Sequence, residues 1–154
     1  MRRSAFTLVE LVVVVAIIGI LSAIAVPAWT VAQLRAKRAE VPPNVEGMKI
    51  AELAYFAAND TFADEVSWYP AALTGSSADK SPRAWPALSA AGGFTEIGWG
   101  PNGEVRGSYA IPYGDATGFE VQGTCDLDAD GDTPLYWCSE SAACGWDAGD
   151  ETVY

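Results

Sequence analysis

The hydrophobic residues of this chain are concentrated near its N-terminus, in an almost unbroken apolar run from Ala5 to Ala28. Between Leu11 and Ala28 no residue is charged, and Ser22 is the one polar side chain. With Phe6 to Val9 added, the run reaches the length of a membrane-crossing helix, at about 1.5 Å of rise per residue. Because lipid cannot satisfy backbone hydrogen bonds, this segment is predicted to be a helix.

The helical pattern continues over residues 29–60, where polar side chains appear among the apolar ones. Pro27 lacks an amide hydrogen, so the helix is expected to loosen between Gly19 and Pro27. Pro42-Pro43 disfavours helical geometry at Val41, so a kink or short break is expected there. The buried stripe of the second helical stretch is predicted from spacings of three and four residues. It consists of Ile50, Leu53, Ala54 and Ala57.

Residues 61–93 contain scattered prolines and glycines and are predicted to be an irregular connecting loop. The aromatic residues of this loop are expected to cap the core rather than to line a ligand site, because large rings are mostly buried as packing. They are Trp68, Tyr69 and Trp85.

From residue 94 onward the apolar period becomes two, which predicts strands. A hairpin is expected from residues 105–113 and 119–125 around the turn at 114–117, with further strands over 97–99 and 134–138. Together they make an antiparallel sheet of about four strands. Its apolar face needs a cover, and the second half of the long helix is the amphipathic element available. The predicted fold class is therefore α+β.

Net charge narrows the range of partners. The chain has 9 basic and 20 acidic residues, a net charge of −11. This balance argues against a head domain that binds nucleic acid, because phosphate backbones are bound by basic patches. The basic group Arg35, Lys37 and Arg38 is interpreted either as a solvated helix face or as a set of contacts to acidic heads of neighbouring subunits.

Histidine is absent, which excludes Ser-His-Asp and Cys-His catalysis and most zinc sites. No paired acid and base for hydrolysis is recognisable either, so no enzymatic activity is predicted. Three cysteines downstream of the apolar run fit an oxidising compartment and one disulfide. Cys138 and Cys144 flank a short turn and are predicted to pair, because Cys125 lies out of register with Cys138 across the expected ladder.

An acidic loop lies before the last predicted strand. Alternate carboxylates with a glycine at the sixth position resemble the first half of a calcium loop. The twelfth position is Trp137 instead of a bidentate glutamate, which excludes an EF-hand. Two interpretations stay open, a looser calcium site and an ordinary Asp/Gly-rich loop. The candidate ligands are Asp126, Asp128, Asp130 and Asp132.

One residue of the apolar run contradicts a simple membrane anchor. Glu10 lies inside the run, where an acid costs about 2.5 to 3.5 kcal/mol on insertion scales. With the short basic leader and the stretch Phe6-Thr7-Leu8-Val9-Glu10, and with Gly19 and Pro27 in the helix, the sequence resembles the type IV pilins and the pseudopilins of type II secretion. In this family the residue before the N-terminal cleavage site is usually glycine, and here it is Ala5.

The resemblance implies a pilin-like fold and a division of the chain. Residues 1–5 would be a leader that a prepilin peptidase removes, after which Phe6 is methylated. Residues 6–28 would form the transmembrane and assembly helix, and 29–60 would continue it into the head. The connecting loop of 61–93 would follow, and 94–154 would hold the sheet, the acidic loop and the disulfide.

The resemblance also implies a function and a location. Before assembly, such a protein would be held in the inner membrane with its N-terminus in the cytoplasm. An inner-membrane assembly platform would then add it to a helical homo-oligomeric filament, together with other pilin-like subunits. Glu10 would meet the Phe6 amine of a neighbouring subunit. The product would be an extracellular pilus for adhesion or motility, or a periplasmic pseudopilus.

The N-terminus and the whole chain also permit other interpretations. Ala23-Ile24-Ala25 permits an ordinary secretory signal cut before Val26, and Arg2-Arg3 suggests a twin-arginine signal. A plain signal-anchor is a third option, in which the head is a calcium-binding or ligand-binding module that does not polymerise. The acid at Glu10 and the length of the apolar run favour the pilin-like interpretation.

Overall fold

The computed structural model describes residues 6–75, 80–87 and 92–150 of the chain. It divides into two compact units, one ending at Leu34 and the other beginning at Arg35. The N-terminal unit is helical and belongs to α1, which runs from Leu8 to Arg38. By length and composition α1 is able to cross a membrane.

α1 passes through Gly19 and Pro27 without interruption. The predicted loosening therefore does not break the helix of the single chain. Pro27 removes one intrahelical hydrogen bond, and the surrounding helix is long enough to continue without it. The Thr30 hydroxyl donates to the Pro27 carbonyl at 2.8 Å, a local hydrogen bond in the turn that follows the proline.

A turn at Ala39 and Glu40 separates α1 from α2, which spans Val41–Asn59. The predicted break is therefore present, but it lies before Val41 rather than at that residue. Pro42 and Pro43 fall in the first turn of α2, where a missing N–H costs little and a fixed φ favours the helix. α2 ends at Asn59, as expected, and Asp60 adopts a left-handed conformation with φ of 56°.

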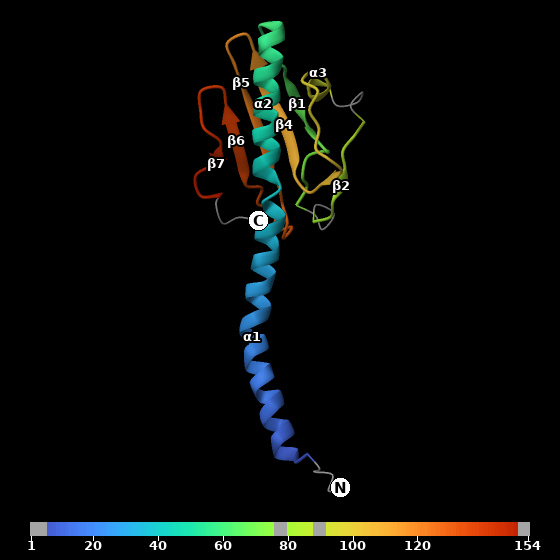
Figure 1. The fold of residues 1–154 in the computed structure, drawn as a ribbon, viewed down its shortest axis with the longest axis vertical. Coiled ribbons are helices and arrows are strands. Elements are labelled where there is room, and N and C mark those ends of the chain that lie inside the picture. The colour runs from blue at the N-terminus through green and yellow to red at the C-terminus, as the bar shows by residue number, and fades with distance from the viewer. Residues whose placement is uncertain (1–5, 76–79, 88–91, 151–154) are drawn as a thin grey trace. The chain divides into compact units, whose positions relative to one another are not determined.

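The second unit contains a five-stranded antiparallel sheet in the order β1-β4-β5-β6-β7 (Figure 1). The strands are β1 Glu65–Tyr69, β4 Ser108–Asp115, β5 Gly118–Thr124, β6 Leu135–Ser139 and β7 Gly145–Trp146. Two short strands, β2 Arg83–Ala84 and β3 Glu104–Val105, pair separately. The predicted hairpin is confirmed as β4 and β5, and the strand predicted at 134–138 as β6.

Two predictions about strands were wrong. The loop predicted for 61–93 contains β1, an edge strand that pairs with β4. Residues 97–99 form no strand, because the short helix α3, Gly93–Glu96, precedes them and the Ile97 N–H donates to the Gly93 carbonyl at 3.1 Å. β1 takes the place of the strand expected at 97–99, and β7, which was not predicted, gives the sheet five strands rather than about four.

The second half of the long helical region covers the sheet, as predicted, with α2 packed on β5 and β6. The residues that α2 buries differ from the predicted stripe, since Ile50 is 68% exposed and Leu53 is 45% exposed. Ala54 and Ala57 are also exposed. The buried positions are also spaced by three and four residues. They were not predicted because one of them is an acid. They are Val41, Val45, Met48 and Glu52.

Gly123 on β5 permits the close approach of α2. A side-chain carbon at this position would lie within 3 Å of both Val41 and Val45. Beside this contact, Trp85 packs edge-on against Phe94 and Trp99, with ring centroids 5.3 and 5.5 Å apart. The predicted packing role of Trp85 is therefore confirmed. Tyr69 joins the same aromatic cluster, and Trp68 is half-buried.

Glu52 is the unusual member of the buried face of α2. Its side chain is fully buried, and its Oε2 accepts a hydrogen bond from the Ala63 N–H at 3.1 Å. Its other oxygen, Oε1, has no hydrogen-bond partner in the part of the chain that the structure describes. Burial raises the pKa of Glu52 to about 7, the Ala63 hydrogen bond opposes this rise, and the charges of Glu96 and Asp64 add to it.

We expect Glu52→Gln to stabilise the head above neutral pH. A carboxyl whose pKa rises from 4.5 to about 7 on folding binds more protons in the folded state, so stability falls as pH increases through that window. Glutamine keeps the acceptor for Ala63 and cannot ionise. Thermal unfolding in detergent should therefore show similar midpoints for the variant and the wild type near pH 4.5, and a higher midpoint for the variant at pH 8.

The matched control is Glu104→Gln, which removes an exposed carboxylate from β3. Its midpoint should follow the wild type across the same pH range. A Glu52→Gln variant that loses stability equally at every pH would contradict the account.

Candidate functional site

The N-terminus of α1 is built by Thr7 and Glu10. One oxygen of the Glu10 carboxylate, Oε2, accepts hydrogen bonds from the Thr7 N–H at 2.8 Å and from the Thr7 hydroxyl at 2.6 Å. In return the Thr7 Oγ1 accepts from the Glu10 N–H at 3.2 Å. This reciprocal arrangement is a capping box, which satisfies backbone groups that have no partner inside the helix.

This capping role was not predicted from the sequence. Its signal was the spacing of threonine and glutamate by three residues directly before an apolar run. Glu10 and Phe6 are both exposed in the structure, and Ala5 lies outside the described residues. The roles predicted for Ala5 and Phe6 in processing and for Glu10 in assembly stay predictions.

The apolar surface of α1 has no cover within the described chain. The large hydrophobic side chains from Phe6 to Trp29 are all exposed, and the most apolar part of the helix has no buried share. Water is a poor environment for such a surface, because each exposed apolar side chain forgoes the favourable free energy of burial. The helix therefore requires lipid or other apolar chains around it.

The residues of the basic group at the end of α1 differ in burial, since Arg35 is exposed and Arg38 is buried. Arg38 is buried, its guanidinium lies 3.4 Å from the centre of the Trp146 ring, and its Nη2 donates to the Asp150 carbonyl. The same Asp150 accepts from the Leu135 N–H at 2.8 Å through its carboxylate. Both interpretations of Arg38, a solvated face and a contact to a neighbouring subunit, were therefore wrong, because Arg38 holds the C-terminal segment of its own head.

The predicted disulfide is confirmed between Cys138 and Cys144, whose Cα atoms are 4.3 Å apart. The loop that it closes is also fixed by Lys49, whose Nζ donates to the Ser139 carbonyl at 2.7 Å and to the Ala142 carbonyl at 2.9 Å. Cys125 is the free thiol and is buried. Burial raises the pKa of Cys125 to about 12, so this thiol stays protonated at neutral pH and is a poor nucleophile.

The acidic loop gathers three of its four aspartates. One oxygen each of Asp126, Asp128 and Asp130 lies within 4.8 Å of the others. Asp126 is fully buried, and its carboxylate accepts from the Ala129 N–H at 2.6 Å and the Gly131 N–H at 3.3 Å. Asp132 is not among the gathered ligands.

Asp128 has an unsatisfied oxygen in this loop. Its Oδ1 is buried and has no hydrogen-bond partner among the described residues. Burial raises the pKa of Asp128, and the charges of Asp130 and Asp126 add to the rise. Hard oxygen ligands that repel one another suit a cation such as calcium. Calcium binding stays a prediction.

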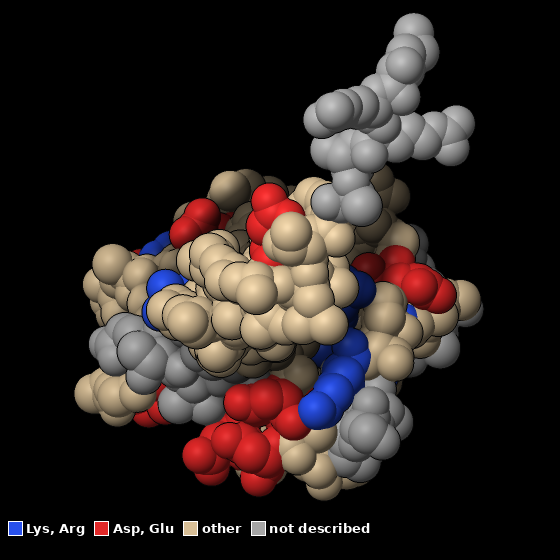
Figure 2. Space-filling model, turned by 90° about the horizontal axis from the view of Figure 1, so that it is seen from below, with Lys and Arg blue, Asp and Glu red and all other residues tan. Residues whose placement is uncertain are grey.

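The head has an uneven distribution of charge on the face seen in Figure 2. Acidic side chains gather into a contiguous group at the lower edge of that view, with basic side chains beside them. Like charges in such a group repel one another unless they are solvated or neutralised by a cation. That the head does not bind nucleic acid stays a prediction.

Comparisons with known proteins agree with the N-terminal features. Residues 1–26 match the prokaryotic N-terminal methylation motif. The type IV major pilin protein PilA of Myxococcus xanthus (strain DK1622) is 36% identical to this chain over 99 residues, which cover 62% of this chain and 41% of that protein. The chain thus spans less than half the length of this curated relative.

The motif defines a class of protein, the prokaryotic proteins that carry an N-terminal methylation signal on an apolar helix. Within that class, this chain is similar to a type IV major pilin and has an α+β fold with a long N-terminal helix. The predicted fold class is confirmed, and the two comparisons support the predicted resemblance to the type IV pilins.

Proposed function

We propose that this protein is a structural subunit of a type IV pilus-like filament. A prepilin peptidase cuts it before Phe6, the new N-terminus is methylated, and an inner-membrane platform assembles it through α1. The observation that carries this proposal is the uncovered apolar surface of α1 with one acid, Glu10, near its start. Adhesion, motility or a related surface function follows from such a filament.

Glu10 argues for assembly rather than simple anchoring. The capping box supplies two hydrogen bonds to the carboxylate but leaves its negative charge without a counter-ion among the described residues. An uncompensated charge is costly in an apolar environment, and pairing with a cation reduces that cost. The amine of Phe6 on a neighbouring subunit, which exists only after cleavage, would supply the cation.

The similarity to a major pilin favours a pilus over a pseudopilus as the product. A structural role also agrees with the residue chemistry. The chain has no histidine, and its free thiol is buried and protonated.

Variants of Glu10 test the proposal. Glu10→Ala removes the charge and the hydrogen bonds that the carboxylate accepts in the capping box, whereas Glu10→Gln keeps an acceptor side chain there and removes the charge alone. Both should reduce sheared surface filaments at least about tenfold, because losing 1.4 kcal/mol of pairing changes each subunit addition about tenfold. Immunoblots of sheared and membrane fractions measure the filament and the unassembled subunit.

Glu104→Ala is the matched control, since it removes an exposed glutamate of the head, and it should assemble normally. If Glu10→Gln forms wild-type amounts of filament and Glu10→Ala does not, the role of Glu10 would be to cap the helix, and its charge would not be needed for assembly. Wild-type amounts with both variants would reject assembly through Glu10, and a wild-type protein that yields no sheared filament would favour an anchored module.

We further propose that the acidic loop binds calcium through Asp126, Asp128 and Asp130. The converging oxygens and the buried, unsatisfied Oδ1 of Asp128 support this proposal. Three carboxylates are fewer than the six to eight oxygens that calcium takes, so backbone carbonyls or water would complete the shell. Asp132 has no place in this set, although the sequence pattern included it.

Calcium at saturating concentration should raise the unfolding midpoint of the full chain by several degrees. A ligand present at 100 times its dissociation constant adds about 2.7 kcal/mol of stability. Asp128→Asn should abolish the shift, and Asp132→Asn, the matched control, should retain it. No shift with calcium, or equal loss in both variants, would contradict the proposed ligand set.

A further inference from the structure

Glu52 holds the connection between α2 and β1. This connection, residues 60–64, has no regular secondary structure, and β1 begins only at the residue after it. Phe62 and Ala63 in the connection are buried. The Glu52 carboxyl group reaches the connection from α2, because its Oε2 accepts from the Ala63 N–H at 3.1 Å. A fully buried carboxyl group therefore helps to fasten an irregular segment to the helix.

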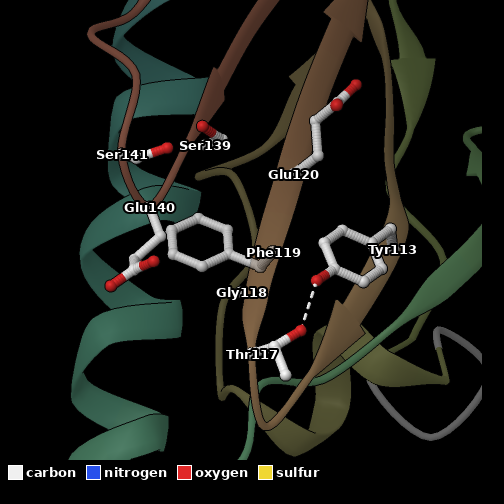
Figure 3. A pocket seen from close by; sticks show the side chains of 8 residues that line it. All are labelled: Tyr113, Thr117, Gly118, Phe119, Glu120, Ser139, Glu140 and Ser141. Carbon is white, nitrogen blue, oxygen red and sulfur yellow. Dashed lines mark hydrogen bonds between the residues drawn. The ribbon is translucent and has the colours of Figure 1, made fainter.

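A backbone hydrogen bond and two ring contacts also close the connection. The Phe62 N–H donates to the Asp115 carbonyl at 3.1 Å. The Phe62 ring contacts those of Phe56 and Phe119, with centroids 4.4 and 4.7 Å apart. Phe119 belongs to β5 and also lines a small open pocket at one end of the sheet (Figure 3). Because the connection lies outside the sheet ladders, it can open while the strands stay paired.

The surroundings of Glu52 disfavour a negative charge. Its side chain is fully buried, and its Oε1 is a buried atom with no hydrogen-bond partner among the described residues. The charged side chains that act on it, Asp64 and Glu96, are both acids. Tyr55, which also interacts with Glu52, donates to Glu96 at 3.4 Å and adds no positive charge. A buried charge without a counter-ion is far more costly than a buried neutral carboxyl group.

The neighbouring elements do not compensate such a charge. Asp115, at the end of β4, is an acid whose carboxylate is bonded within its own hairpin. Glu65, at the start of β1, accepts from the Gly93 N–H at 3.0 Å. Lys49, one turn before Glu52 on α2, donates to carbonyl groups of the loop after β6 instead. An ionised Glu52 is therefore stabilised chiefly by contact with water, which the closed connection prevents.

We propose that the protonation of Glu52 controls a local opening of the connection between α2 and β1. When Glu52 carries its proton, the carboxyl group is neutral and the connection stays closed over it. When the proton is lost, residues 60–64 open, the Ala63 N–H loses its acceptor, and water solvates the carboxylate. The head thereby responds to the pH around it without unfolding its sheet. The proposal does not depend on filament assembly or on calcium binding.

The direction of the pH response follows from the balance of effects on Glu52. An ionised carboxylate is the better acceptor for the Ala63 N–H, whereas burial and the two nearby acids favour the neutral form. Burial dominates and raises the pKa of Glu52 from 4.5 to about 7 in the closed state. A carboxyl group exposed to water in the open state keeps its ordinary pKa. The closed state thus binds more protons, and its stability falls as pH rises through that window.

The test is amide hydrogen exchange of the full chain in detergent micelles, measured by NMR at pH 5 and pH 8 and corrected for intrinsic exchange rates. The open fraction at Phe62 and Ala63 should be at least about tenfold larger at pH 8, because one bound proton changes the ratio of open to closed states tenfold per pH unit. Gln122 lies on the central strand β5, which pairs on both sides. Its amide should stay at least about tenfold better protected than that of Ala63, because the opening is local.

Glu52→Gln separates the proton from the shape of the side chain. Glutamine cannot ionise, so the open fraction at Ala63 should be the same at pH 5 and pH 8. The matched control is Glu104→Gln, which removes an exposed carboxylate from β3 and should keep the wild-type dependence on pH. Three results would overturn the proposal. They are a wild-type open fraction that does not change with pH, a wild-type pH dependence in Glu52→Gln, and equal protection of Ala63 and Gln122 at pH 8.

Should Glu52→Gln fail to fold, Glu96→Gln keeps the proposal testable. Glu96 is exposed on α3, and its charge raises the pKa of Glu52. Removing that charge makes an ionised Glu52 less costly in the closed state, so the open fraction at Ala63 should be smaller than in the wild type at pH 8. An equal or larger open fraction in this variant would overturn the proposal.

Discussion

The apolar surface of α1 is the constraint on which the account of this protein depends. The helix carries large hydrophobic side chains around its circumference, and the rest of the described chain covers none of its most apolar stretch. A surface of this kind is stable only against lipid or against other apolar helices. Glu10 adds a charge to that surface, and its capping box with Thr7 fixes where the carboxylate lies. Helix formation and assembly are thereby proposed to use the same side chain.

The head is organised around contacts that begin where α1 ends. Arg38 stacks on Trp146 and holds the Asp150 carbonyl, so the C-terminal segment is tied to the last turn of α1. α2 then packs on β5 and β6, with Gly123 permitting the approach. The cross-linked loop after β6 is fastened to α2 by Lys49. The same loop and the β4–β5 hairpin line a small pocket at one end of the sheet (Figure 3).

The sequence predicted those features whose signals are local and strong. The apolar run, the alternation of the hairpin and the close spacing of Cys138 and Cys144 each led to a confirmed element. Other features needed tertiary contacts to be seen. The buried face of α2 was not predicted because it includes Glu52, and an acid is rarely fully buried. Arg38 was interpreted as a surface cation because its contact with Trp146 joins residues that are far apart in the sequence. Of the candidate sites, the sequence located the acidic loop but not the distinction between Asp132 and its three neighbours.

The proposed assembly through α1 is tested by the identity of the first residue of the mature protein, measured by intact-mass and fragment-ion mass spectrometry on protein from the producing cell. We predict a chain that begins at Phe6 and carries one methyl group on its amine, because this amine is the proposed partner of Glu10. A mature chain that begins at Val26 would lack both the motif and Glu10, and would contradict the account.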